Sequence, residues 1–167
     1  AYDIANVTLS EAFSPLIGVN MTMKNSFSLK AEYRKQRNLA LNVTSVQLTE
    51  AHSDEFVLGG GYTIKNLNFT AKNKDGRQKK VSNDLKLNVD VSYKNIKSLL
   101  RKVDEGITQM SSGNKVWSLK LSADYVLSQK INLQFFYDHQ STTPFISTSY
   151  PVSADNVGIN VKIMLTR

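Results

Sequence analysis

Apolar and polar residues alternate without a break between Asp84 and Tyr93. A period of two residues is typical of a β-strand, because successive side chains of a strand point to opposite faces. The apolar members of this stretch are Leu85, Leu87, Val89, Val91 and Tyr93. We therefore expect a strand here with one apolar face and one polar face.

The same alternation recurs in six further stretches of the chain. Some of the polar connections between them are short enough to be the tight turns of antiparallel hairpins. The six stretches are residues 16–24, 27–34, 56–64, 117–125, 131–138 and 157–166. The pattern predicts an all-β fold of about seven antiparallel strands, preceded by an irregular extension over residues 1–15 that ends at Pro15.

The position of the aromatic residues bears on which strand face meets water. In a soluble barrel the apolar face points inward, whereas in a membrane barrel it points toward lipid and the interior is polar. Here the aromatic residues gather toward the ends of the apolar stretches, and Leu, Val, Ile and Ala fill the middles. Aromatic girdles around an aliphatic belt are typical of outer-membrane barrels. The predicted lipid-facing girdle residues are Phe27, Tyr33, Phe56, Tyr62, Tyr93, Trp117, Tyr125 and Tyr137.

The opposite strand face carries Asp, Lys, Asn, Ser, Thr and Gly, a mixture that suits a hydrated lumen. A soluble barrel can show a similar mixture on its outside, so this face alone decides little. The predicted lumen-facing residues are Lys30, Glu32, Arg34, Asp84, Lys86, Asn88, Asp90, Lys120, Asp124, Asn132, Gln134, Asp138 and Lys162.

The predicted connections differ in length between the two ends of the strands. Short turns at residues 24–25 and 128–130 lie at one end, and long polar connections near residues 44–53, 95–115 and 140–156 lie at the other. Outer-membrane barrels have this asymmetry, with the longer connections outside the cell. On this topology the C-terminus is periplasmic and the extension over residues 1–15 is extracellular. Residues 66–82 are an exception, because they form a long connection on the short side.

The predicted number of strands points to a larger assembly. Seven is odd, whereas single-chain bacterial outer-membrane barrels have an even number of strands. An open strand edge in lipid leaves backbone groups without partners, at a cost of several kcal/mol for each group. We therefore expect residues 16–167 to be one transmembrane sector of a much larger barrel.

The formal charge of +7 raises the question of a nucleic-acid partner. Much of the excess lies in residues 66–82, where five Lys and Arg residues surround Asp75–Gly76. No aromatic side chain that could stack on a base lies between Lys72 and Lys80. We interpret this segment as a solvated loop and expect no nucleic acid. The chain also has no Cys, and no apolar run long enough for a spanning helix.

The two histidines give no clear catalytic or metal site. His139 follows Asp138, but neighbours in a strand point to opposite faces and cannot orient each other. His52 lies near Asp54 and Glu55, and a polar loop end explains this group better than a metal site does. We expect no enzyme activity, no metal and no cofactor.

Several segments, spread in order over nearly the whole chain, resemble the C-terminal end of the SprA/Sov proteins. These segments are SEAFSPLIGV (10–19), EYRK (32–35), RNLAL (37–41), DEFV (54–57), SADYVL (122–127), FYD (136–138) and SYP (149–151). Together they are more specific than any single short motif. The SprA/Sov family is the outer-membrane translocon of the type IX secretion system of Bacteroidetes, which exports folded cargo proteins and is linked to gliding motility.

The resemblance implies a very large barrel, of which this chain would be the C-terminal part. It implies as partners the remaining barrel chain of the translocon, a PorV-like shuttle protein that caps a lateral opening, a periplasmic Plug protein, the secreted cargo proteins and outer-membrane lipid. It implies no catalytic residues. Family members are far longer than 167 residues, so the size of this chain departs from the family.

The prediction for function is a structural wall segment of a protein-conducting channel in the outer membrane. A first alternative is a free-standing small outer-membrane barrel, with residues 1–14 supplying an eighth strand. A second alternative, from a different class, is a soluble β-barrel that binds an apolar ligand. The direction in which the apolar face points separates the second alternative from the other two.

Overall fold

The computed structural model describes residues 4–72, 78–128, 131–146 and 149–164, without the side chains of residues 69–82. The predicted Asp75–Gly76 turn, most of the predicted 128–130 turn and residues 165–166 of the last predicted strand lie outside the described residues.

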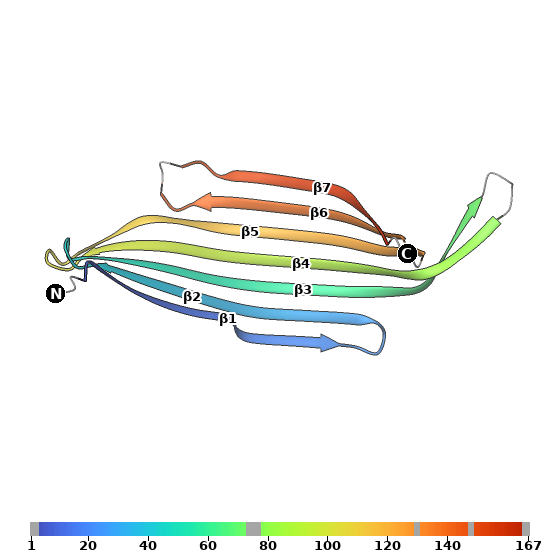
Figure 1. Ribbon diagram of the computed structural model, residues 1–167, viewed down its shortest axis with the longest axis horizontal. Helices are drawn as coiled ribbons and strands as arrows, with labels where there is room; N and C mark the ends of the chain where they lie inside the picture. Colours follow the sequence, from blue (N-terminus) through green and yellow to red (C-terminus); the bar gives the residue numbers. More distant parts are fainter. Residues whose placement is uncertain (1–3, 73–77, 129–130, 147–148, 165–167) are drawn as a thin grey trace.

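Seven strands form one antiparallel sheet, in which each strand pairs with the next one in sequence (Figure 1). The strands are β1 (Asn6–Thr22), β2 (Phe27–Asn42), β3 (Gln47–Lys72), β4 (Gln78–Lys102), β5 (Ile107–Ser128), β6 (Ile131–Pro144) and β7 (Val152–Ile163). The prediction of an all-β fold with seven antiparallel strands is confirmed. The alternation of apolar and polar residues was therefore a sufficient signal for a part of every strand.

The strands extend well beyond the predicted stretches. β3 has 26 residues and β4 has 25, and their pairing runs from Gln47↔Lys102 to Lys72↔Gln78, past a register shift between Ile64 and Leu67. The prediction of long loops near residues 44–53, 66–82 and 95–115 is therefore wrong over most of their length. Polar residues on both faces remove the apolar alternation, but the backbone hydrogen bonds of a ladder do not depend on it.

The connections at residues 43–46 and 103–106 are short turns. Each contains a residue with positive φ, Val46 at 50° and Gly106 at 66°. Glycine adopts this conformation without steric cost, so the second turn suits its sequence well. At the same end of the sheet, β6 continues to Pro144 and β7 starts at Val152, which shortens the predicted 140–156 connection.

The prediction of an irregular extension over residues 1–15 is wrong from Asn6 onward. β1 starts at Asn6 and pairs with β2 from Asn6↔Asn42, with a register shift between Phe13 and Ile17. This segment alternates weakly, but its backbone can still pair with that of β2. The same finding removes the eighth strand proposed for residues 1–14, because Asn6–Ser14 are part of β1.

The described sheet is open and forms a single layer. β1 and β7 are its edges, and the antiparallel order makes them run in the same direction. Val57 and Tyr125, at 8% and 6% exposure, are the only buried apolar side chains among the described residues. The described sheet therefore has no hydrophobic core, although a soluble sheet normally buries its apolar face against a second layer.

Candidate functional site

The strand register places every predicted girdle residue on one face of the sheet. Residues that pair directly across antiparallel strands point to the same face. On this criterion one face carries Phe27, Tyr33, Phe56, Tyr62, Tyr93, Trp117, Tyr125 and Tyr137. It also carries the Leu, Val and Ile residues between them, so we call it the apolar face.

Four aromatic residues form a continuous row across β2 to β5. Tyr33 pairs with Phe56, Phe56 with Tyr93, and Tyr93 with Trp117. The rings of Tyr33 and Phe56 stack, with centroids 4.7 Å apart and planes at 29°. Tyr137 lies on β6 in the row of Leu121 and Val89, four residues along the strands from the aromatic row.

The apolar belt is close in height to the apolar band of outer-membrane barrels. On β3, β4 and β5 it runs over nine residues, from Phe56 to Ile64, from Tyr93 to Leu85 and from Trp117 to Tyr125. Eight steps of a strand cover ~27 Å, and a strand tilt of ~40° reduces this to ~21 Å. Outer-membrane barrels have an apolar band of about 25 Å. Many side chains of this belt are exposed, such as Leu58 at 61% and Val157 at 77%, whereas others, such as Leu85 and Leu119, are half-buried.

Two tyrosines end the belt in the same way. The hydroxyl of Tyr33 donates to Oδ1 of Asp54 at 2.8 Å, and that of Tyr137 donates to Oδ1 of Asp155 at 2.7 Å. In both cases the carboxylate lies on the next strand, one row farther from the belt. A tyrosine with its ring on apolar surface and its hydroxyl on a polar group is typical of a membrane–water boundary.

His139 has a partner that sequence reasoning did not find. Its Nδ1 lies 2.7 Å from Oδ1 of Asp155, and its ring makes an edge contact with Trp117 at 5.5 Å. Asp138 points to the other face, as predicted from strand geometry. Asp155 is 16 residues away in sequence, so only the strand register could identify it.

Beyond the aromatic row the apolar face becomes charged around Glu50. This residue is 2% exposed, and its carboxylate contacts Arg37 at 2.7 Å, His52 at 2.8 Å and Arg101 at 2.6 Å. Burial raises the pKa of Glu50, but the hydrogen bond from Arg37 and the charges of Arg101 and His52 outweigh burial, so the pKa lies below the usual 4.5. We call these four residues the Glu50 cluster.

At the other end of the belt, Phe27 pairs with Tyr62. Tyr125 differs from the expected exposed girdle position, because it is nearly buried and its hydroxyl donates to the backbone carbonyl of Leu67 at 3.4 Å. The register shift between Ile64 and Leu67 lies beside this contact. Tyr125 is thus on the apolar face but covered by its own chain.

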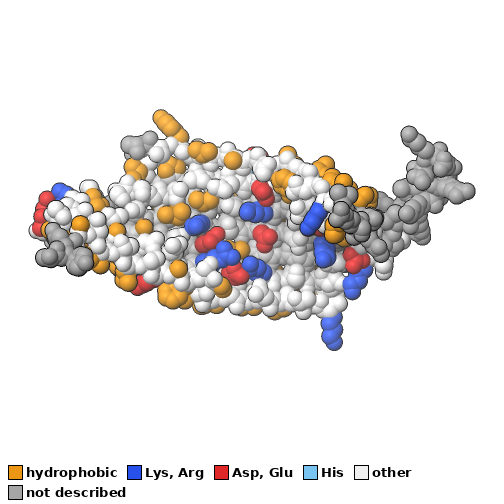
Figure 2. Space-filling view, viewed as in Figure 1, with side chains coloured by type: hydrophobic (Ala, Val, Ile, Leu, Met, Phe, Trp, Pro, Cys, Tyr) orange, Lys and Arg blue, Asp and Glu red, His pale blue; other side chains and the backbone are white. Residues whose placement is uncertain are grey.

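All predicted lumen-facing residues lie on the opposite, polar face. Figure 2 shows acidic and basic side chains interspersed over the middle of the sheet. Ion pairs lie on this face, with Lys30–Glu32 at 3.1 Å and Arg34–Glu32 at 2.7 Å within β2, and Arg34–Glu55 at 3.6 Å between β2 and β3. The register also places Asp90, Lys120 and Asp138 side by side on β4, β5 and β6.

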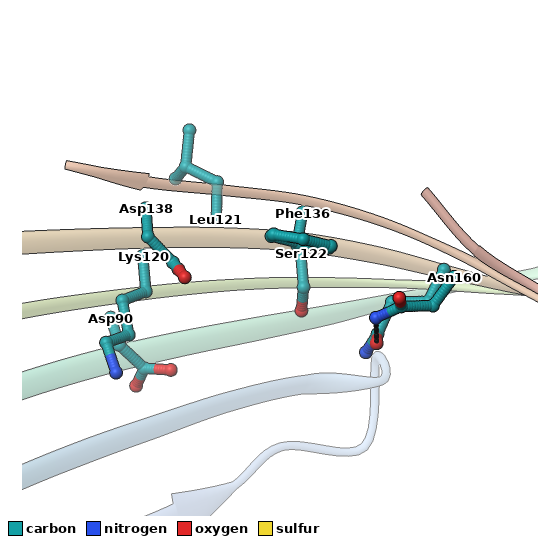
Figure 3. A pocket seen from close by; sticks show the side chains of 8 residues that line it. Asp90, Lys120, Leu121, Ser122, Phe136, Asp138 and Asn160 are labelled. Atoms are coloured by element: carbon teal, nitrogen blue, oxygen red, sulfur yellow. Dashed lines mark hydrogen bonds between the residues drawn. The ribbon is translucent and has the colours of Figure 1, made fainter. Parts of the chain in front are cut away.

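A shallow groove of about 380 Å³ lies over these three residues on the polar face (Figure 3). Ser122, Phe136 and Asn160 also point toward it, whereas Leu121 points to the other side of the sheet. The ring of Phe136 covers Gly158, where a Cβ would lie 2.6 Å from Cζ of the ring. The groove is open, and two carboxylates and one ammonium group line it together with neutral polar side chains.

Other kinds of site find no support in the described residues. They contain no group of three His, Asp or Glu side chains that could hold a metal ion. They also include no helix with the length and apolar character needed to cross a membrane. The side chains of the basic segment from Lys72 to Lys80 lie outside the described part of the chain.

Comparison with models of known protein families and with curated proteins found no match to this chain.

Proposed function

We propose that the chain is a wall segment of a protein-conducting channel in a bacterial outer membrane. The observation that carries this proposal is the apolar face, which is exposed and is bounded by tyrosines that hydrogen-bond to carboxylates. Monomeric soluble proteins rarely expose so extensive an apolar patch. Lipid chains would cover this face, with the aromatic row at the level of the headgroups.

The polar face would line the lumen. Its ion pairs and the juxtaposed Asp90, Lys120 and Asp138 favour water over lipid. A charge-balanced surface without an apolar patch also offers little adhesion to a passing folded protein. A soluble ligand-binding barrel accounts less well for the same sheet, because it would enclose the apolar face and expose the polar one.

The two open edges support a larger barrel. β1 and β7 each have one side without a described strand partner, and in lipid each free backbone group costs several kcal/mol. Because the two edge strands run in the same direction, joining them directly would need a parallel seam. An odd number of further strands between β7 and β1 gives an all-antiparallel barrel with an even total.

The type IX secretion translocon is the specific channel that we propose, on the strength of the resemblance to the SprA/Sov proteins. The resembling segment over residues 10–19 includes the register shift of β1, and residues 54–57 include Asp54 and Phe56 of the belt boundary. In this assignment the chain pairs with the remaining barrel chain, contacts PorV-like and Plug proteins, and supports export of folded cargo and gliding motility.

Affinity purification of the tagged chain from detergent-solubilised outer membranes tests the proposal. We expect a much larger β-barrel chain to co-purify with it, together with shuttle and plug subunits. Single cysteines placed at the edge positions Val157 and Val19 should crosslink to that larger chain. A chain that extracts without detergent and runs as a monomer would contradict the proposal.

A further inference from the structure

On the apolar face, beyond the aromatic row, the side chains of two lysines lie close to one phenylalanine ring. Nζ of Lys97 lies 5.5 Å from the ring centroid of Phe145, and Nζ of Lys115 lies 5.3 Å from it. The ring lies on Gly113, where a Cβ would be 2.8 Å from its Cδ2 atom. The backbone N–H of Phe145 also donates to the carbonyl of Gly113 at 2.9 Å. The ring position is therefore fixed by the backbone of β5.

Within the described residues, neither lysine forms an ion pair with a carboxylate. Both lysines are exposed. By contrast, Arg37 and Arg101 in the neighbouring Glu50 cluster are paired. Two like charges close to one ring repel each other, and an anion bound by both would relieve that repulsion.

The height of this group along the strands matches the headgroup layer. Lys115 lies two residues before Trp117 on β5, and Lys97 lies four residues after Tyr93 on β4, all on the apolar face. Aromatic girdles lie at headgroup level, and lysines just outside them reach the lipid phosphates. The paired residues on the apolar face at the other end of the belt, from Phe27–Tyr62 to Ile131–Ile163, carry no charge.

We propose that Lys97, Lys115 and Phe145 form a binding site for the phosphate of an anionic lipid headgroup in the outer leaflet. The lysines bind the phosphate, and the Phe145 ring, which both lysines contact, lies beside the acyl chains. This inference rests on the proposed membrane function, because it needs the apolar face to meet lipid. Free phosphate has the same charge but lacks acyl chains to lie along the belt, so the site should favour the lipid.

Native mass spectrometry of the purified outer-membrane complex tests this site, with diphosphorylated lipid A as the probe. The double variant Lys97→Gln/Lys115→Gln should lower the lipid affinity by roughly tenfold to thirtyfold, since each Lys near a membrane surface contributes about fivefold. Lys97→Arg/Lys115→Arg should retain binding. The matched control, Lys86→Gln/Lys120→Gln on the polar face, should leave the affinity unchanged.

Three results would overturn the site. These are equal lipid affinity in the Lys97/Lys115 and control variants, equal affinity for lipid A without its phosphates, and displacement of the lipid by millimolar inorganic phosphate. Failure of the membrane function itself is distinguishable. A membrane wall should leave only every second residue of β4 accessible to water, and failure of the membrane function would abolish that pattern as well. If the Gln variant does not assemble, the Lys97→Gln and Lys115→Gln single variants give the same comparison.

Discussion

The hydroxyl of Tyr33 on β2 donates a hydrogen bond to Oδ1 of Asp54 on β3, and this contact lies where the apolar face of the sheet becomes charged. The ring of Tyr33 stacks on Phe56 within the belt. Tyr137 and Asp155 repeat the same arrangement between β6 and β7. The two pairs mark one boundary of the belt at two places on the sheet.

Tyr33→Phe should have a small effect, because it removes only the hydrogen bond to Asp54. We expect the local opening free energy of β2 to fall by about 1 kcal/mol. Tyr33→Leu should cost a further ~1 kcal/mol, because it also removes the stacking on Phe56. Hydrogen-exchange mass spectrometry of the complex in lipid nanodiscs measures both. Equal losses for the two variants would show that the ring contact does not stabilise the boundary.

Val89→Arg should strongly impair assembly, because it places a charge in the middle of the apolar belt. The expected cost is about 2–4 kcal/mol near the bilayer midplane. The control, Asn88→Arg, introduces the same side chain on the polar face one residue away and should assemble normally. The amount of each variant in isolated outer membranes is the measurement. Normal assembly of both variants would contradict the assignment of the faces.

The Glu50 cluster should make β2, β3 and β4 sensitive to acid at the strand ends that lie beyond the aromatic row. The folded-state pKa of Glu50 lies below its usual value of 4.5, so its stabilisation is present above pH 4.5 and is lost as the pH falls through the lower, folded-state pKa. Exchange protection factors of these strand ends should therefore drop in that acidic range. The cluster lies beyond the belt, and the side chains of its two arginines are partly exposed around the buried carboxylate.

Glu50→Gln is the matched variant for this pH dependence. It should lower the protection at neutral pH, because Arg37 and Arg101 lose their shared carboxylate. Its protection factors should then stay constant through the acidic range in which those of the wild type drop. A similar acid-dependent drop in the variant would mean that another group controls the stability of these strand ends.

Two glycines on the apolar face should respond differently to alanine. A Cβ at Gly113 would lie 2.8 Å from the backbone oxygen of Ile96 and 2.8 Å from the ring of Phe145, so the backbone must move. Gly113→Ala should therefore destabilise β5 by about 1–3 kcal/mol. A Cβ at Gly60 meets no atom within 4 Å, so Gly60→Ala should be neutral or stabilising. Thermal melting of the complex in detergent compares the two, and the opposite ranking would contradict the packing around Phe145.

The sequence predicted the belt well because the information is local. Alternation assigns Leu85 and Lys86 to opposite faces without any knowledge of their neighbours, and the strand register places the predicted girdle residues together on one face of the sheet. The strand ends were missed because neighbouring residues there, such as Lys97 and Ser98, point to opposite faces and are both polar. The alternation is lost, while the backbone pairing continues.

The Glu50 cluster and the His139–Asp155 pair could not be predicted, for a different reason. Glu50 meets Arg37 and Arg101 only because β2, β3 and β4 align in one register, and the residues lie far apart in sequence. The lengths of the turns fix that register, and polar segments gave no signal of where those turns lie.

Cysteine scanning of residues 84–93 on β4 in native outer membranes is the most direct test of the central claim. The chain has no Cys of its own, so each single variant reports one position. After labelling with a water-soluble, membrane-impermeant maleimide and separation of the chain, we expect reaction at the even positions, Asp84 to Ser92, once the channel is open to the reagent. The odd positions, Leu85 to Tyr93, should stay unlabelled in lipid. Labelling at odd positions, or at all ten equally, would contradict the account of this sheet as a membrane wall.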